Sequence, residues 1–325
     1  MRWNSVLMSA VGVALASLVG TNSSASADYP DRPVTIIVPY AAGGGTDIAA
    51  RFFAEEFRKR LGQQFLVENL PGANGSVGTA NAAKSPPDGY RLVTGSSNTM
   101  IMNPYMMGDV GYTKDDFVPI GFTGFTEIAV SVRPTLEVHD IVGLVAYAKE
   151  HPGELNYGSA GIGNNSHQAG ELFKKRTGTE IEHIPYQGGA PAIAALLAGE
   201  VDVVFQNIAE IMPHIKSGKA TPLAVMTPER SVFLPDVPTL GESGIKDSDV
   251  TGYTAIYAPA GTPKEILQRL SDEMNKIIED PETRERLLQL GLVPRTSSLE
   301  EIAKFEEEQI PLAKELVDLA GGPQK

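Results

Sequence analysis

The 325-residue chain contains no cysteine, which excludes disulfide bonds, thiol nucleophiles and iron–sulfur clusters. Positive charge is in deficit, with 27 Lys and Arg against 40 Asp and Glu and a formal net charge of −13. Nucleic acid and anionic membrane surfaces are therefore poor partners. The five histidines lack metal-ligand spacings such as H-E-x-x-H, so the sequence predicts neither a metal site nor a cofactor.

Motifs of common enzyme classes are missing too. No Lys follows the glycines 43–45, so there is no phosphate-binding G-x-x-x-x-G-K-[ST] loop. Residues 161–163 begin like a dinucleotide fingerprint, but Ser166 stands where its third glycine belongs. Ser159 does not lie in a G-x-S-x-G motif. An exported α/β hydrolase or nucleotide-dependent enzyme stays an alternative, without a candidate catalytic residue.

The N-terminus has the pattern of a secretory signal peptide at residues 1–27. Arg2 supplies a short positive region, residues 6–20 are apolar, and Ala25-Ser26-Ala27 is a small-x-small cleavage site. The apolar run is short for a membrane span, and no cysteine follows it for lipid attachment. The sequence predicts export to the periplasm and cleavage after about Ala27.

From residue 28 onward, short apolar runs alternate with amphipathic segments, which is typical of an α/β protein with a mostly parallel sheet. In a first unit we expect strands at 34–38, 64–68, 90–94, 117–122 and 128–132, and helices at 48–61 and 79–84. In a second unit we expect strands at 155–158, 182–185, 201–205 and 222–226, and helices at 141–150, 166–176, 190–197 and 208–217. A tail with helices at 265–278, 282–290 and 299–319 is expected to pack on the first unit.

Each unit contains a glycine-rich turn between a strand and a helix: VPYAAGGGTDIAAR (38–51) and YGSAGIGNNSHQAGELF (157–173). Free backbone N–H groups and the helix dipole make such turns anion sites. Neither turn contains Lys, and Arg51 lies beyond the first. Because ligands of open α/β sheets bind at the carboxyl ends of strands, we expect the two turns to face one cleft. Amides there could hold a carboxylate without a cation.

The chain resembles the extracytoplasmic solute receptors of the tripartite tricarboxylate transporter family, also called Bug receptors. The resemblance covers nearly the whole mature chain and rests on eight segments in order. They are YPDRPVTIIVPYAAGGGTDIAAR (29–51), VENLPGANGSVG (67–78), PPDGYRL (86–92), DDFVPI (115–120), SAGIGNNSHQAGELF (159–173), HIPYQGGAPAIAALLAGEVDVVF (183–205), TPERSVFLPDVPTL (227–240) and APAGTP (258–263).

The resemblance implies a two-lobed, type II periplasmic-binding-protein fold with a ligand cleft between the lobes. Residues 28–130 and 251–325 would form lobe 1, and residues 131–250 would form lobe 2. The chain would cross near 127–131 and return near 249–252. The ligand would be a small organic carboxylate, bound by backbone amides, hydroxyl groups and water. The first side of the site would include Tyr40, Ala42, Gly43, Gly44, Gly45, Thr46 and Asp47, and the second Ser159, Ala160, Gly161, Gly163, Asn164, Asn165 and His167.

Several of these residues have a structural alternative. The glycines could only permit a tight turn, with positive φ expected at Gly44. Thr46 could be a helix N-cap instead of a ligand contact. Asp47 is expected to shape the loop or hold a water, since a carboxylate repels a bound carboxylate, unless the ligand carries an amine. His167 could either contact the ligand or support the loop.

Four further residues are candidates because each lies at or after the end of a strand: Ser96, Tyr186, Phe205 and Asn207. Phe205 is expected to provide an apolar wall of the cleft and Asn207 an amide. The predicted partners are a carboxylate ligand and the membrane subunits of a tripartite tricarboxylate transporter, with the receptor itself a monomer. Presentation of the ligand to a membrane sensor kinase is the alternative role, which the sequence does not separate from transport.

Overall fold

The computed structural model describes residues 29–319 and 321–322. The predicted signal peptide, residues 1–27, lies outside the described residues. The strands are β1 (Val34–Val38), β2 (Phe65–Asn69), β3 (Arg91–Ser96), β4 (Phe117–Val132), β5 (Asn156–Ser159), β6 (Glu182–Pro185), β7 (Val203–Asn207), β8 (Thr221–Val225) and β9 (Thr251–Pro259). The α-helices are α1 (Gly45–Leu61), α2 (Ser76–Ala83), α3 (Asn103–Met106), α4 (Ile141–Glu150), α5 (Asn165–Thr177), α6 (Gly189–Ala198), α7 (Ile208–Lys216), α8 (Lys264–Glu279), α9 (Pro281–Gln289) and α10 (Leu299–Leu319).

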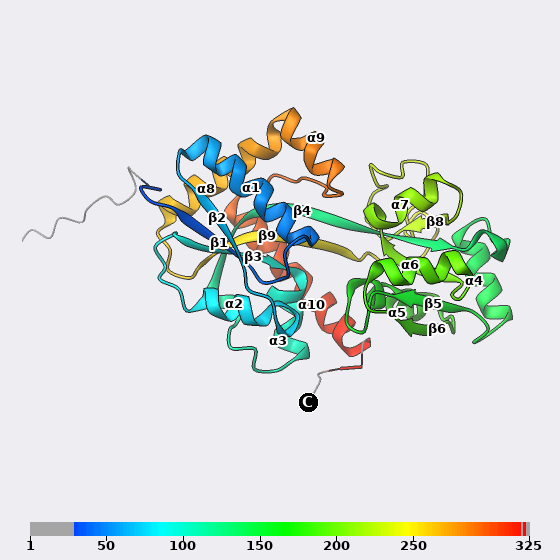
Figure 1. Cartoon of the computed structure of the whole chain (residues 1–325). Coiled ribbons are helices and arrows are strands. Elements are labelled where there is room, and N and C mark those ends of the chain that lie inside the picture. Colours follow the sequence, from blue (N-terminus) through cyan, green and yellow to red (C-terminus); the bar gives the residue numbers. More distant parts are fainter. Residues whose placement is uncertain (1–28, 320, 323–325) are drawn as a thin grey trace, which may run out of the picture.

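The strands form two lobes joined by long strands (Figure 1). The strand order is β2-β1-β3-β9-β4-β7-β5-β6, and β8 pairs with β4. We call the part built on β1, β2, β3, β9 and residues 117–127 of β4 the first lobe. The part built on β5–β8 and residues 128–132 of β4 is the second lobe. The predicted two-lobed α/β architecture is therefore confirmed.

The prediction of a mostly parallel sheet is wrong. Four strand pairs are parallel, β1 with β2 and β3, and β5 with β6 and β7. Four are antiparallel, and each of these involves β4 or β9. The two strands predicted at 117–122 and 128–132 are one 16-residue strand, β4, which passes from one lobe into the other. Parallel neighbours need a crossover connection, usually a helix. The lobes are instead connected by β4, which runs through both of them and pairs antiparallel with β9.

Strand β9 is absent from the sequence-based assignment, although it lies at the centre of the first lobe. It pairs with β3 on one side and with β4 on the other. Tyr253 and Tyr257 on this strand are almost fully buried. The predicted return of the chain near 249–252 agrees with the start of β9 at Thr251.

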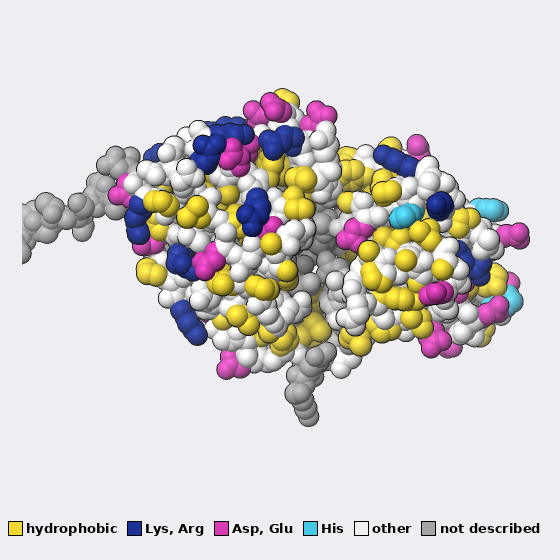
Figure 2. Space-filling view, in the orientation of Figure 1, with side chains coloured by type: hydrophobic (Ala, Val, Ile, Leu, Met, Phe, Trp, Pro, Cys, Tyr) yellow, Lys and Arg dark blue, Asp and Glu magenta, His cyan; other side chains and the backbone are white. Residues whose placement is uncertain are grey.

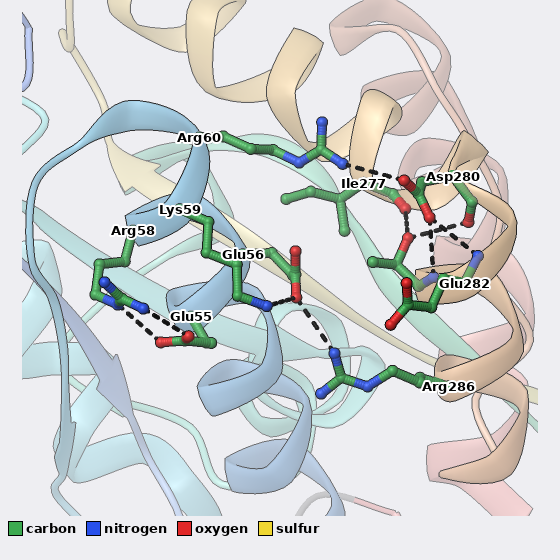
Figure 3. A network of polar contacts seen from close by, with 10 residues as sticks. Glu55, Glu56, Arg58, Lys59, Arg60, Ile277, Asp280, Glu282 and Arg286 are labelled. Atoms are coloured by element: carbon green, nitrogen blue, oxygen red, sulfur yellow. Dashed lines mark hydrogen bonds and ion pairs between the residues drawn. The ribbon is translucent and has the colours of Figure 1, made fainter.

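The far end of α1 is joined to α9 and its N-terminal cap by charged side chains (Figure 3). The carboxylate of Glu56, 5% exposed, lies 3.4 Å from the guanidinium of Arg286 on α9. Arg60 lies 3.8 Å from Asp280, whose carboxylate also caps the start of α9. Gly62 then ends α1 with a left-handed φ of 74°. These contacts hold the C-terminal end of α1 and leave its glycine turn free at the other end.

The tail does not pack on the first lobe alone, as the sequence predicted. Helices α8 and α9 do cover that lobe, but α10 contacts both β4 and helix α5 of the second lobe. Glu315 on α10 accepts hydrogen bonds from both terminal nitrogens of Arg176 on α5, at 2.6 and 2.8 Å. Lys175 lies 2.8 Å from the same carboxylate. The C-terminal helix therefore bridges the two lobes.

Candidate functional site

The first glycine turn leads from β1 into α1 and is open to solvent. Gly43 has a φ of +85°, whereas Gly44 is extended with φ −77° and ψ 165°. The expectation of positive φ at Gly44 is therefore wrong, because the turn is made one residue earlier. Gly44 is also the N-cap of α1, so Thr46 is not the cap that the sequence suggested. No side chain caps α1, and Ala42 to Gly45 are exposed.

Asp47 braces this turn from within the first turn of α1. Its Oδ2 accepts hydrogen bonds from the backbone N–H of Gly43 at 2.9 Å and from Nε of Arg51 at 3.0 Å. Its Oδ1 accepts from the Asn69 amide at 2.9 Å. Burial alone would raise the pKa of Asp47, but these hydrogen bonds outweigh it and lower the pKa to about 2. The expected loop-shaping role agrees with this geometry, and Arg51 is the cation that balances Asp47.

Tyr40 and Ser96 lie together beside the turn. The two hydroxyl oxygens are 3.3 Å apart, with Tyr40 half-buried and Ser96 almost buried at the end of β3. The Tyr40 ring lies against Gly75, where an added Cβ would come within 3.1 Å of it. Burial raises the pKa of Tyr40, so its hydroxyl stays protonated at neutral pH. This pair offers two hydroxyl groups next to the exposed amides.

The second turn leads from β5 into α5, and more of its backbone N–H groups are hydrogen-bonded within the turn than in the first. Asn164 caps α5 by accepting from the Ser166 N–H at 3.0 Å. The N–H of Ala160 donates to Ser166 Oγ at 2.8 Å, and the N–H of Gly161 donates to Ser159 Oγ at 3.2 Å. Most amides of this turn are therefore already used within it. The sequence predicted free N–H groups at both turns, but the second turn offers fewer of them than the first.

Two stacked histidines support the second turn. The rings of His167 and His183 lie 4.1 Å apart at 17°. His167 Nδ1 accepts the Gly163 N–H at 3.1 Å, and His183 Nε2 lies 2.6 Å from Ser159 Oγ. Burial lowers the pKa of both rings, in His183 to about 4 with a contribution from His167. Both rings are neutral at pH 7, and loop support is the role that these contacts give His167.

A cavity of about 290 Å³ lies between the lobes next to the second turn. Its second-lobe lining runs from Ala160 to Asn164, and Asn74, Asn98 and Asn103 line it from the first lobe. A furrow between the lobes is visible on the surface (Figure 2). The first turn does not line this cavity, but Tyr40 contacts Gly75, the neighbour of Asn74. The two turns therefore lie near one interlobe space and do not touch across it.

Three predicted residues have structural roles in the second lobe. Phe205 is fully buried against Tyr157 and Phe173, so it is core and not a wall of the cleft. The prediction was wrong because β7 is covered on that face by α5. Asn207 caps α7 through a bond from the Ala209 N–H at 3.0 Å. Tyr186 is half-buried against the core of the second lobe.

Asn74 and Asn103 of the cavity are residues that the sequence analysis did not single out. Asn103 donates to the Asn74 carbonyl at 2.9 Å and to Ser76 Oγ at 3.1 Å. Asn98 lies in a π-helical turn after β3, and its buried Oδ1 accepts no hydrogen bond among the described residues. In the sequence, the run of four polar residues 96–99 at the end of a predicted strand indicates that this segment reaches the distal end of the ligand, and Asn98 does line the cavity.

Within residues 29–319 and 321–322, no three His, Asp or Glu side chains are placed to hold a metal ion. Over the same part of the chain, none of the helices combines the length and apolar character needed to cross a bilayer.

Two lobes on crossover strands with a cavity between them are the architecture of the periplasmic binding proteins that this structure resembles. Residues 49–321 match the family described as tripartite tricarboxylate transporter family receptor. The protein belongs to this family, which is one of solute-binding receptors and not of enzymes.

Its relatives cover almost the full chain. BugT of Bordetella pertussis is 33% identical over 307 residues, 94% of each chain. Rpa4515 of R. palustris, solved with adipate, is 31% identical with a TM-score of 0.77, and the match covers 91% of this chain and 99% of Rpa4515. MatC of Rhodopseudomonas palustris, solved with bound malate, is 30% identical with a TM-score of 0.72 over 89% of this chain and 100% of MatC.

Proposed function

We propose that this receptor captures a small organic carboxylate at the N-terminus of α1 and delivers it to the membrane subunits of a tripartite tricarboxylate transporter. The observation that carries the proposal is the exposed, uncapped start of α1. Tyr40 of the same turn lies against Gly75, next to the cavity residue Asn74. The N–H groups of Gly45, Thr46 and Asp47 have no acceptor within the helix. A carboxylate oxygen is the partner that these groups and the helix dipole favour.

Charge balance supports the same site. Asp47 carries a negative charge in the first turn of α1, but Arg51 pairs with it at 3.0 Å. The turn therefore presents dipoles without net side-chain repulsion. Tyr40 and Ser96 add hydroxyl groups, and the asparagines of the cavity add neutral amides for the rest of the ligand. The adipate and malate found in two relatives are dicarboxylates of a size that suits such a space.

We also propose that ligand capture closes the lobes. The crossover strands β4 and β9 are the natural hinge, since Glu127 pairs with Thr251 where the lobes meet. Ile162 at the tip of the second turn is 63% exposed, and its N–H donates no hydrogen bond within the described residues. On closure this amide could reach a ligand held by α1.

A ligand screen tests the binding role. Mono-, di- and tricarboxylates and amino acids are each added to the mature protein, and binding is measured by thermal shift and calorimetry. We expect one-to-one binding of a carboxylate. Thr46→Ala should weaken it by about ten-fold through loss of one hydroxyl bond. If no carboxylate binds, the proposal is wrong.

Export and delivery are tested in cells. The mature protein from the periplasm is expected to begin near Asp28. Deletion of the gene should abolish uptake of the carboxylate identified in the screen. If uptake is unchanged while a transcriptional response to that carboxylate is lost, the partner is a membrane sensor and not a transporter.

A further inference from the structure

A second and larger cavity, about 920 Å³, lies beside the crossover strands. The first lobe contributes Phe125, Arg295 and Phe305 to its lining, and the second lobe contributes Asp249. Glu127 lines it from the point where β4 crosses. This cavity shares no residue with the one beside the second glycine turn. Its volume falls within the range of small-molecule sites.

One side of this cavity is aromatic and cationic. The guanidinium of Arg295 lies 5.6 Å from the ring centre of Phe125 and 5.5 Å from that of Phe305. No carboxylate among the described residues lies within 4.0 Å of Arg295, and the side chain is exposed to the cavity. The other two arginines of the lining, Arg176 and Arg230, are each paired with a glutamate. Arg295 is therefore the cation available to an anionic group.

Two carboxylates of the lining, Asp249 and Glu127, have no cationic partner within the described residues. Asp249 is half-buried and makes neither an ion pair nor a hydrogen bond through its side chain within the described residues. Glu127 accepts a bond from Ser231 at Oε2 only. Burial raises the pKa of both carboxyl groups, and Asp247 adds to the effect at Asp249. A positive charge placed between the two carboxyl groups would favour their ionised forms and lower both pKa values.

Charges of both signs and an aromatic surface line the same cavity, and they fit a ligand that carries the same three kinds of group. We propose that the crossover cavity is a second binding site, for an α-amino acid with an apolar side chain. Its carboxylate pairs with Arg295, its ammonium group lies against Glu127 and Asp249, and its side chain covers Phe125 and Phe305. Because both lobes line this cavity, an occupant also biases the angle between them.

The test uses L-phenylalanine as the probe and calorimetry on the mature protein. We expect saturable one-to-one binding, both alone and in the presence of excess adipate. Two analogues each lack one charge: 3-phenylpropanoate has no ammonium group and 2-phenylethylamine has no carboxylate. Each should bind at least about ten-fold more weakly than L-phenylalanine in the presence of adipate.

Substitutions test whether L-phenylalanine binds in this cavity. Arg295→Gln and Asp249→Asn should each weaken L-phenylalanine binding by at least about ten-fold. Arg284→Gln, an exposed arginine of α9, is the matched control and should have no effect. Gly44→Val at the first turn should leave L-phenylalanine binding unchanged, which separates this site from the carboxylate site. Absence of saturable binding, equal affinity in Arg295→Gln, or loss of binding in Gly44→Val would each overturn the proposal.

Discussion

The carboxylate of Asp47 accepts a hydrogen bond from the backbone N–H of Gly43, 2.9 Å away, across the mouth of the first turn. This contact closes the turn that the positive φ of Gly43 begins. It also removes one amide from the set available to a ligand. The exposed amides that remain belong to the start of α1, and Asp47 fixes where they point.

The first prediction concerns the pH dependence that Asp47 confers. Its pKa is lowered from 3.8 to about 2, so it stabilises the fold above pH 4 and loses this effect as the pH falls towards 2. Asp47→Asn should lower the free energy of unfolding by about 2 kcal/mol at pH 7. The new side chain has one acceptor oxygen and an NH₂ group, which would face the three donors that the Asp47 carboxylate now accepts from. Urea unfolding should show the difference shrinking below about pH 4. Asp272→Asn, at an exposed position, is the control and should change little.

The second prediction separates the two adjacent glycines of the first turn. Gly43→Val should lower the free energy of unfolding by about 1–3 kcal/mol, because Gly43 has a φ of +85°. Gly44→Val should fold normally, since its φ is −77° and an added Cβ would lie 3.6 Å from the nearest atom, the carbonyl oxygen of Ala41. Its side chain would instead cover the amides of α1 and abolish carboxylate binding. Thermal unfolding and calorimetry measure the two effects, and a Gly44→Val protein with unchanged affinity would show that the anion is held elsewhere.

The third prediction concerns Glu306, which is 1% exposed and accepts hydrogen bonds from Tyr253 and Tyr257. Burial raises the pKa of Glu306 despite these bonds. The protonated form is therefore favoured in the folded protein, and stability from this group is lost as the pH rises through the folded-state pKa. Glu306→Gln should remove that loss, so the variant gains stability relative to the wild type as the pH rises above the ordinary pKa of a glutamate. Glu180→Gln, at an exposed position of the second lobe, is the control and should follow the wild type.

The fourth prediction concerns the bridge between α10 and α5. The hydrogen bonds from Arg176 outweigh burial, and with Lys175 they lower the pKa of Glu315 to about 2. Glu315→Gln should lower the free energy of unfolding by about 1–2 kcal/mol, since the pair is only about a quarter exposed. Glu308→Gln breaks an ion pair that is 3.8 Å long and more than half exposed, and it should have almost no effect. Equal losses in chemical denaturation would contradict the assignment of Glu315 as the interlobe contact.

Local signals predicted most elements of this fold. The strand at 34–38 and the helices at 141–150 and 299–319 have the predicted bounds. Both glycine turns also lie between a strand and a helix as expected. Apolar periodicity and glycine stops are enough for such elements, because burial on one face decides them.

The remaining errors arise from contacts that the apolar pattern of the sequence does not mark. Gly124 lies in the gap between the strands predicted at 117–122 and 128–132, and in the structure it stands at a register shift of β4 against β9. Phe205 follows a strand pattern, but only the position of α5 shows that its side chain is buried. The positive φ fell at Gly43 and not Gly44 because Asp47 accepts from that amide, a contact four residues away.

The antiparallel pairing of β4 with β9 has an architectural consequence. The chain leaves the first lobe after Glu127 and re-enters it at Thr251, and these two residues are direct partners in the sheet. The whole second lobe is thus an insertion whose two ends lie side by side. Exchange of such an insertion between two receptors at these junctions would keep the path of the chain, but it would also have to keep the contact of Arg176 with Glu315 on α10. New ligand preferences could then arise by recombination of lobes, with the amide turn of α1 kept in place.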